Sequence, residues 1–175
     1  MKNKNWPLII GVSLPLIFIV ALSVIVFLPR LFVTPAHNFI YSADTNYYTN
    51  DYYRNTYKVV QGRVTLDPIP ARYTAENERR DAPALYLYDV KSDTSHQITL
   101  AEADAYTVDP GPSSPDGYVV SYEYGHNGIF ELFGSDNSNQ GYFISKGSSA
   151  RKLTGITSGD RYTNGGGFKL IGWIQ

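Results

Sequence analysis

The sequence predicts a mainly β protein with a single transmembrane helix at its N-terminus. The first observation is an apolar run from Trp6 to Leu28 that contains no charged side chain. The second is the composition of the rest of the chain, where short Val-, Ile- and Tyr-rich segments alternate with Gly- and Pro-containing turns. Such segments favour strands over helices. We therefore expect an N-terminal helix followed by a small antiparallel β domain.

The apolar run is long enough to cross a bilayer, whose hydrocarbon core is about 30 Å thick. Lys2 and Lys4 before it are also compatible with a cleaved signal peptide. The apolar part of a signal peptide is usually shorter, however, and ends at small residues. The best cleavage position here contains Pro35. An uncleaved signal-anchor is the favoured interpretation, with Trp6 suited to the membrane interface.

Within this run, Pro15 lies in mid-helix and predicts a modest kink. We expect Ser13 or a neighbouring helix to satisfy the carbonyl that Pro15 leaves without a donor. Gly11 is close by, and Leu28 ends the anchor. A kinked helix with small residues is also suited to packing against a second helix.

The positive charges indicate the orientation of the anchor. Lys2 and Lys4 precede the helix, whereas only Arg30 follows it before Arg54. Since positively charged flanks favour the cytoplasmic side, we expect the C-terminal domain to be extracytoplasmic at the cell membrane.

Composition divides the chain into an anchor (1–31), a Tyr- and Asn-rich linker (32–56) and a β-rich domain (57–175). The linker has few aliphatic residues and is most simply a stalk. Its tyrosines Tyr47, Tyr48, Tyr52 and Tyr53 could instead form an interaction surface, because Tyr offers a large amphipathic contact area.

Turn residues separate the expected strands of the β domain. Pro- and Gly-rich turns around 67–83 and 109–117 interrupt the series. Residues 73–80 are the only helical candidate after the anchor. The expected strands are 57–66, 84–90, 96–100, 118–124, 128–133, 141–145, 151–154 and 168–174, in an antiparallel meander with 84–90 and 96–100 as a hairpin.

Two parts of this series look alike and resemble a known family. The sequence LYLYDV, a polar turn and HQIT match YFIS, a polar turn and RKLT, and an apolar strand follows each copy. Ser114-Pro115-Asp116-Gly117 and the following strand resemble the TolB-type β-propeller repeat, as does the IGW that contains Trp173. The resemblance covers about residues 84–175. It implies structural roles, with a turn at Pro115–Gly117 and Trp173 packed between blades, and it carries no catalytic residues.

The chain has material for about two blade-like units, whereas propellers usually close with about 4–8. Two units cannot form a ring, so we expect either two sheets packed as a small sandwich or assembly with other chains. Exposed strand edges favour such pairing, including self-association.

No pattern in the chain indicates catalysis or cofactor binding. His37, His96 and His126 lack metal-ligand spacing, and Ser113 and Ser114 do not lie in a nucleophile elbow. The oxygen-rich loop 134–141 lacks the terminal Glu of a calcium-binding loop. A net charge of −1 gives no basic stripe for nucleic acid. We expect no enzyme, no cofactor and no bound metal.

The resulting hypothesis is a single-pass, non-enzymatic membrane protein of the cell envelope. Its β domain would bind protein partners or take part in envelope assembly. One alternative is a glycan-binding or glycan-processing module that uses the Tyr-rich segment. Another is an accessory subunit whose helix packs within a larger membrane complex.

Overall fold

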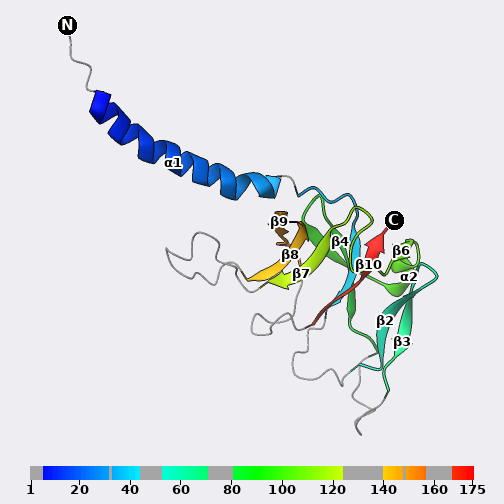
Figure 1. The fold of residues 1–175 in the computed structure, drawn as a ribbon. Helices are drawn as coiled ribbons and strands as arrows, with labels where there is room; N and C mark the ends of the chain where they lie inside the picture. Colours follow the sequence, from blue (N-terminus) through cyan, green and yellow to red (C-terminus); the bar gives the residue numbers. More distant parts are fainter. Residues whose placement is uncertain are drawn as a thin grey trace.

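The protein consists of one long helix followed by a β domain (Figure 1). The computed structural model describes residues 6–31, 33–43, 53–70, 81–123, 140–147, 149–156 and 167–175. Its helices are α1 (Trp6–Leu31) and α2 (Leu100–Ala103). Its strands are β1 (Phe39–Ala43), β2 (Asn55–Val60), β3 (Arg63–Pro68), β4 (Ala84–Asp89), β5 (Thr94–Ile98), β6 (Val108–Asp109), β7 (Val119–Glu123), β8 (Gly141–Lys146), β9 (Ser149–Lys152) and β10 (Phe168–Ile174).

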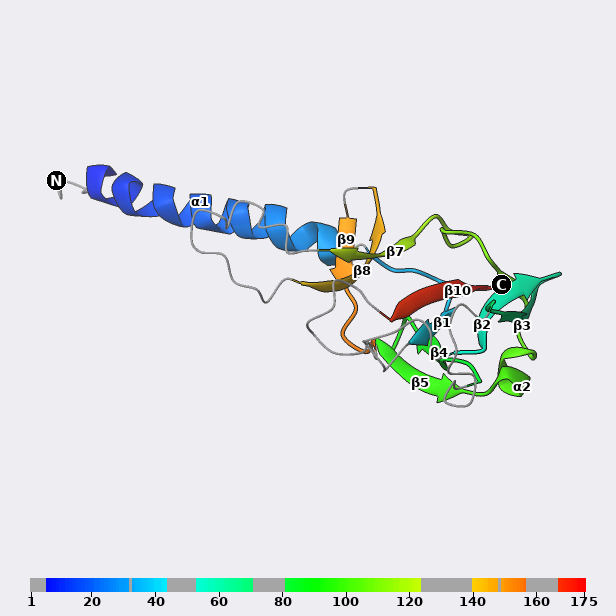
Figure 2. The same cartoon turned by 90° about the horizontal axis from the view of Figure 1, so that it is seen from below.

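The strands form three antiparallel sheets. The largest has five strands in the order β5-β4-β1-β10-β6, and the others are the hairpin β2-β3 and the three-stranded sheet β7-β8-β9. Figure 2 shows the three-stranded sheet nearest to α1 and the β2-β3 hairpin with α2 farthest from it. The mainly β, antiparallel class expected from the sequence is confirmed.

The five-stranded sheet is the middle layer and buries side chains on both faces. We call the face toward β7–β9 the proximal face and the face toward β2, β3 and α2 the distal face. Large aromatic side chains dominate the proximal core. Its fully buried members include Phe39, Tyr41, Tyr88, Trp173 and, from the three-stranded sheet, Ile144.

The distal core is mainly aliphatic. Ile40, Leu85, Leu87 and Ile171 come from the five-stranded sheet, and Val64 comes from β3. Successive residues of a strand point to opposite faces, so Phe39 and Tyr41 face one core while Ile40 faces the other. The pairing of β1 with β10 shifts its register between Ile40 and Tyr41. Because of this shift, Ile171 lies in the distal core and Trp173, two residues later, lies in the proximal core.

The first strand corrects the predicted linker. Residues 32–56 were expected to connect the anchor to the β domain, but Phe39–Ala43 pairs with β4 and β10 in the middle of the five-stranded sheet. All five of its residues are buried. The aromatic rings of Phe39 and Tyr41 supply the apolar area that the aliphatic count did not reveal. The β domain therefore begins before residue 57.

The expected strand 57–66 is a hairpin in the structure. Gln61 and Gly62 both have positive φ, at 50° and 76°, and they turn the chain between β2 and β3. Two successive residues with positive φ are typical of the tight turn that joins antiparallel strands. The alternation of Tyr57 to Val60 and of Val64 to Leu66 therefore belongs to two strands, not one.

Other expected elements occur at the positions that the sequence indicated. β4 and β5 pair as a hairpin, with Leu85 opposite Ile98. The end of the expected strand 96–100 differs, because Thr99 caps α2 through a reciprocal bond with Glu102. The expected strand 128–133 and helical candidate 73–80 lie outside the described residues.

The connection of the sheets differs from the expected meander. β1 lies between β4 and β10, so strands far apart in the sequence are neighbours. The strands that follow the two repeated hairpins also lie in different sheets. β7 pairs with β8 in the three-stranded sheet, whereas β10 pairs with β1 and β6.

Candidate functional site: the junction of helix and β domain

The most unusual surface of the described chain is that of α1. Its apolar side chains are exposed on all sides between Ile10 and Val24, and Ile17 and Leu14 are exposed by 66% and 64%. A helix that packs on one face of a soluble domain would have a polar stripe on the other side. In the described part of the chain, no helix is long and apolar enough to cross a membrane.

The predicted anchor residues all lie on α1, which begins at Trp6 and continues without interruption through Pro15 to Leu28. A side chain at Gly11 would meet open space. The hydroxyl of Ser13 donates to the Ile10 carbonyl at 3.3 Å. Pro15 leaves the carbonyl of Gly11 without a donor. Ser13 was expected to satisfy that carbonyl, but its bond goes to the Ile10 carbonyl instead.

The segment between α1 and β1 is part of the β domain, and we call residues 33–38 the junction segment. Val33 and Pro35 are buried. The backbone N–H of Thr34 donates to the Tyr118 hydroxyl at 3.3 Å, and that of Ala36 donates to Asp116 Oδ2 at 2.9 Å. Burial and hydrogen bonds thus hold the chain where it leaves the helix.

The turn that binds this segment is the Ser114–Gly117 sequence singled out above. The Gly117 N–H donates to the Ser114 carbonyl at 2.8 Å, and Gly117 has a φ of 84°, a conformation that favours glycine. Ser114 Oγ donates to Asp116 Oδ1 at 2.5 Å and accepts from the Tyr118 N–H at 2.7 Å. Pro115 is exposed. The turn therefore presents the free oxygen of Asp116 to the junction segment.

Two opposing effects act on the pKa of Asp116. Partial burial of the carboxyl raises it, whereas the hydrogen bonds from Ser114 and from the Ala36 N–H lower it. The net effect is a pKa below the ordinary value of 3.8. Asp116 is accordingly a carboxylate at neutral pH. Lys146 adds a further contact, since its Nζ donates to the Asp116 carbonyl at 2.8 Å.

The last strand holds the junction segment from its other side. The Ile174 N–H donates to the Asn38 carbonyl at 2.8 Å, and the Asn38 side chain accepts from the Val90 N–H at 3.1 Å. His37 Nδ1 lies 2.8 Å from the Ile174 carbonyl. Because a carbonyl can only accept, Nδ1 is the protonated nitrogen.

Trp173 lies in the proximal core, between the five-stranded and three-stranded sheets. It is fully buried, and its ring meets Phe39 edge-on at 5.2 Å between centroids. Its indole Nε1 is buried without a hydrogen-bond partner among the described residues. Its contribution is therefore packing.

A second link between these two sheets was not predicted. The Asp93 carboxylate, in the β4–β5 turn, accepts from Thr154 Oγ1 at 2.5 Å and from the Tyr88 hydroxyl. Burial raises the pKa of Asp93, but these bonds outweigh it, and the net pKa is below the ordinary value. Burial raises the pKa of Tyr88, and the hydrogen bond to Asp93 raises it further. The φ of Asp93 is 56°. In the sequence, Asp93 is one of several residues in a polar turn, and nothing distinguishes it from its neighbours.

The Tyr-rich surface is described only in part. Tyr47, Tyr48 and Tyr52 lie outside the described residues, and Tyr53 is buried, with 5% of its surface exposed. Tyr53 is therefore not a member of an exposed platform.

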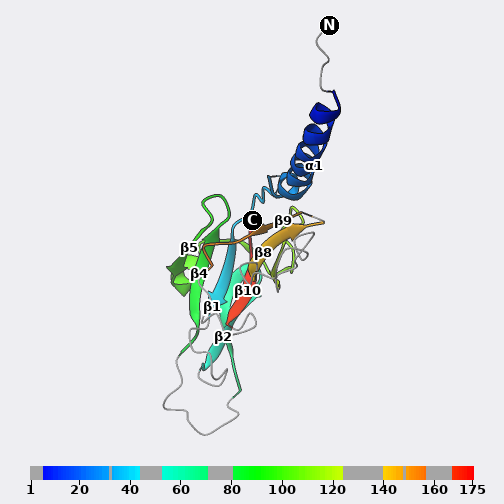
Figure 3. The same cartoon turned by 90° about the vertical axis from the view of Figure 1, so that its left-hand side faces the viewer.

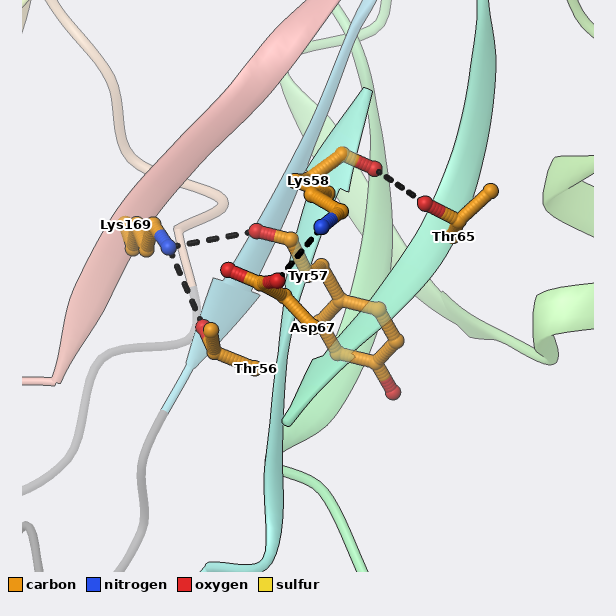
Figure 4. A network of polar contacts seen from close by, with 6 residues as sticks. All are labelled: Thr56, Tyr57, Lys58, Thr65, Asp67 and Lys169. Carbon is orange, nitrogen blue, oxygen red and sulfur yellow. Dashed lines mark hydrogen bonds and ion pairs between the residues drawn. The ribbon is translucent and has the colours of Figure 1, made fainter. Parts of the chain in front are cut away.

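Tyr53 lines a pocket of about 280 Å³ between the ends of β1, β2 and β10, together with Ser42, Asn55, Thr56, Phe168 and Lys169. Lys169 Nζ donates to Thr56 Oγ1 at 3.0 Å and to the Tyr57 carbonyl at 3.1 Å (Figure 4). On the neighbouring hairpin, Lys58 and Asp67 form a separate ion pair at 2.6 Å (Figure 4). Lys169 thus serves mainly to tie β10 to β2.

The described residues contain no cluster of His, Cys, Asp or Glu that could hold a metal ion. His37, for example, contacts a backbone carbonyl of the last strand. Comparisons with protein-family models, curated proteins and solved structures give no match. The resemblance to the TolB-type repeat therefore stays a prediction.

Proposed function

We propose that this protein is a single-pass, non-enzymatic membrane protein that holds a β domain at the membrane surface for binding other proteins of the cell envelope. The observation that carries the proposal is the contrast between α1, which exposes its apolar side chains on all sides, and the described part of the β domain, which buries most of its own. A large exposed apolar surface indicates a surface made to contact lipid or another protein.

The length of the helix supports lipid as its main environment. α1 has 26 residues, which corresponds to about 39 Å at 1.5 Å per residue. Side-chain exposure on α1 is described only from Ile10 to Val24, and the described part contains no helix long and apolar enough to cross a membrane. The proposal therefore rests on the whole uncharged run from Trp6 to Leu28 in the sequence. A span of this length exceeds the hydrocarbon core of about 30 Å.

The junction segment supports a role in presentation. Thr34 and Ala36 are hydrogen-bonded to the β domain just after the helix ends. The domain is consequently held close to the membrane instead of on a long stalk. Such an arrangement is suited to contacts with other proteins at the membrane surface.

Membrane fractionation of the full chain tests the anchor. We expect wild-type protein of uncleaved mass to remain in membranes after an alkaline wash and to need detergent for release. Ile17→Arg should abolish or strongly reduce this retention, because an arginine at the centre of a membrane helix costs about 2.5–3.5 kcal/mol. Val60→Arg, at an exposed apolar position of β2, is the matched control and should behave as wild type. A processed, freely soluble product would contradict the proposal.

Crosslinking in membranes, followed by purification in mild detergent, tests the protein-binding role. We expect at least one other envelope protein, or a second copy of the chain, to be recovered with the wild-type protein. The Ile17→Arg variant should be absent from this complex. A protein that is always recovered alone would contradict this part of the proposal.

A further inference from the structure

We infer that the hairpin of β8 and β9 lies against the membrane surface and binds the headgroups of anionic phospholipids. This inference rests on the proposed function, because it requires α1 to cross the bilayer. It goes further in naming the part of the β domain that meets the membrane and the lipid chemistry that this part recognises.

The position of β9 is the first argument. β9 is the strand of the β domain that α1 contacts most extensively. Figures 2 and 3 show β9 beside the C-terminal end of α1 and running across the direction of the helix. If α1 crosses the bilayer, a strand in this place lies along the headgroup layer. The bonds of Thr34 and Ala36 to the β domain keep it there.

The charge of the hairpin is the second argument. The hairpin, residues 141–152, contains Lys146 and Lys152 and no Asp or Glu. Its third basic residue, Arg151, points inward, where the guanidinium donates to the Val90 carbonyl at 2.8 Å. The stretch 99–109, which includes α2 at the opposite end of the domain, contains Glu102, Asp104 and Asp109 and no Lys or Arg. The protein as a whole has a net charge of only −1. At that distal end, Arg63 lies 3.8 Å from Asp104 and Lys58 pairs with Asp67. The two lysines of the hairpin near the helix favour an anionic membrane surface on that side.

The outer face of the three-stranded sheet is the third argument. Tyr142 and Ile144 point into the proximal core, so Phe143 and Ser145 point away from it. Phe143 pairs with Lys152, and Ser145 pairs with Ala150 and with the exposed Val119. An aromatic ring beside a lysine is a combination suited to the interface between lipid and water.

Two carboxylates in the described part of this side of the domain are bound within the protein. Asp116 accepts from Ser114 and Ala36, and Asp93 accepts from Thr154 and Tyr88. Glu123 lies on the outer face at the start of β8, opposite Gly141. Lys146, whose Nζ contacts the Asp116 carbonyl, brings its charge to the junction itself.

Spin labelling of the full chain in lipid nanodiscs tests the inference. The chain has no cysteine, so Ala150→Cys carries a single label on the hairpin and Val60→Cys carries one on the distal β2-β3 hairpin. Each labelled protein is placed in discs of phosphatidylcholine alone and in discs that also contain phosphatidylglycerol. The measurement is the collision rate of the label with an aqueous nickel chelate.

We expect the collision rate at Ala150→Cys to fall severalfold in the anionic discs and the rate at Val60→Cys to be the same in both. Adding Lys152→Gln should weaken the lipid contact about fivefold, the effect of one basic residue near an anionic surface. Equal rates at Ala150→Cys in both kinds of disc would overturn the inference while leaving the membrane anchor in place. Protein that is not retained in either kind of disc would overturn the proposed function itself.

Discussion

The two faces of the five-stranded sheet are stabilised in different ways. The proximal face packs aromatic rings, including Phe39, Tyr88 and Trp173, against the three-stranded sheet, and polar links cross the same interface. The distal face packs mainly aliphatic residues, such as Leu85 and Ile171, against a hairpin and a short helix. Hydrogen bonds also cross the distal side, from Lys169 to β2 and from the Val108 N–H to the Gly62 carbonyl. The two faces therefore differ mainly in the size and aromatic character of the side chains that they pack. On the proximal side, the polar links join the five-stranded sheet to the three-stranded sheet, whose strand β9 contacts α1.

The largest effect is expected from removing the ring at the centre of the proximal core. Trp173→Ala should lower the free energy of unfolding by about 3–5 kcal/mol, because a fully buried tryptophan leaves a cavity that neighbours fill only partly. Ile171→Ala, on the distal face two residues earlier, should cost about 2–4 kcal/mol. Denaturant unfolding of the full chain in detergent, followed by circular dichroism, measures both. An equal or smaller loss for Trp173→Ala would contradict the comparison.

A smaller effect is expected where the segment after β9 passes the β4–β5 turn. A β-carbon at Gly155 would lie about 2.3 Å from the Asp93 carbonyl oxygen, so Gly155→Ala must displace the β4–β5 turn. We expect a loss of about 1–3 kcal/mol, typical of overpacking. Gly11→Ala is the control, since a β-carbon there meets open space and helix propensity favours alanine. Thermal unfolding should show a lower midpoint for the first variant only.

Removing the bond from the β domain to the junction segment should have a modest effect that depends on pH. Asp116→Ala deletes the acceptor of the Ala36 N–H and should cost about 1–2 kcal/mol at neutral pH. Folding lowers the pKa of Asp116, so the wild-type contribution is present above about pH 4 and is lost as the pH falls through the folded pKa. The wild type and the variant should therefore converge in acid.

Asp109→Ala is a matched control for Asp116→Ala. Its carboxylate accepts from the Gly111 N–H two residues later, so the bond is local and does not reach the junction segment. In discs, the Asp116 variant should loosen residues 33–38 in hydrogen exchange, whereas the Asp109 variant should leave them unchanged. Equal protection in both variants would mean that the bond to Ala36 does not fix the junction.

The smallest effect is expected on the distal hairpin. Lys58 and Asp67 form an ion pair at 2.6 Å, but their side chains are 50% and 40% exposed. Lys58→Ala should therefore change the free energy of unfolding by less than about 1 kcal/mol. A loss as large as that of Asp116→Ala would show that the distal face contributes directional bonds of similar strength.

Local patterns predicted the elements whose partners are close in the sequence. The β4–β5 hairpin has its turn and both strands within a short stretch, and Ser114–Gly117 encodes a tight turn through its own side chains. β1 could not be recognised in this way. Phe39–Ala43 lies among Tyr and Asn residues, and its partners β4 and β10 are distant in the sequence. The hairpin turn at Gln61 was hidden because only its second residue is glycine.

The candidate site shows the same division. The sequence indicated the apolar helix and the Ser114–Gly117 turn separately, but not that Asp116 binds the backbone just after the helix. The sequence also indicated Trp173 as a packing residue, but it did not indicate that the ring contacts Phe39. The link between Asp93 and Thr154 had no local signal, because each is an ordinary residue of a polar turn.

By itself, the sequence determined the long apolar helix, the mainly β class and the local turns. These follow from hydrophobicity and backbone preference, which act within a few residues. The tertiary structure alone decided that β1 is central, that the junction segment is held between a turn and the last strand, and that β9 lies beside α1. Such choices depend on which distant segments bury each other's side chains, and no local pattern records that pairing.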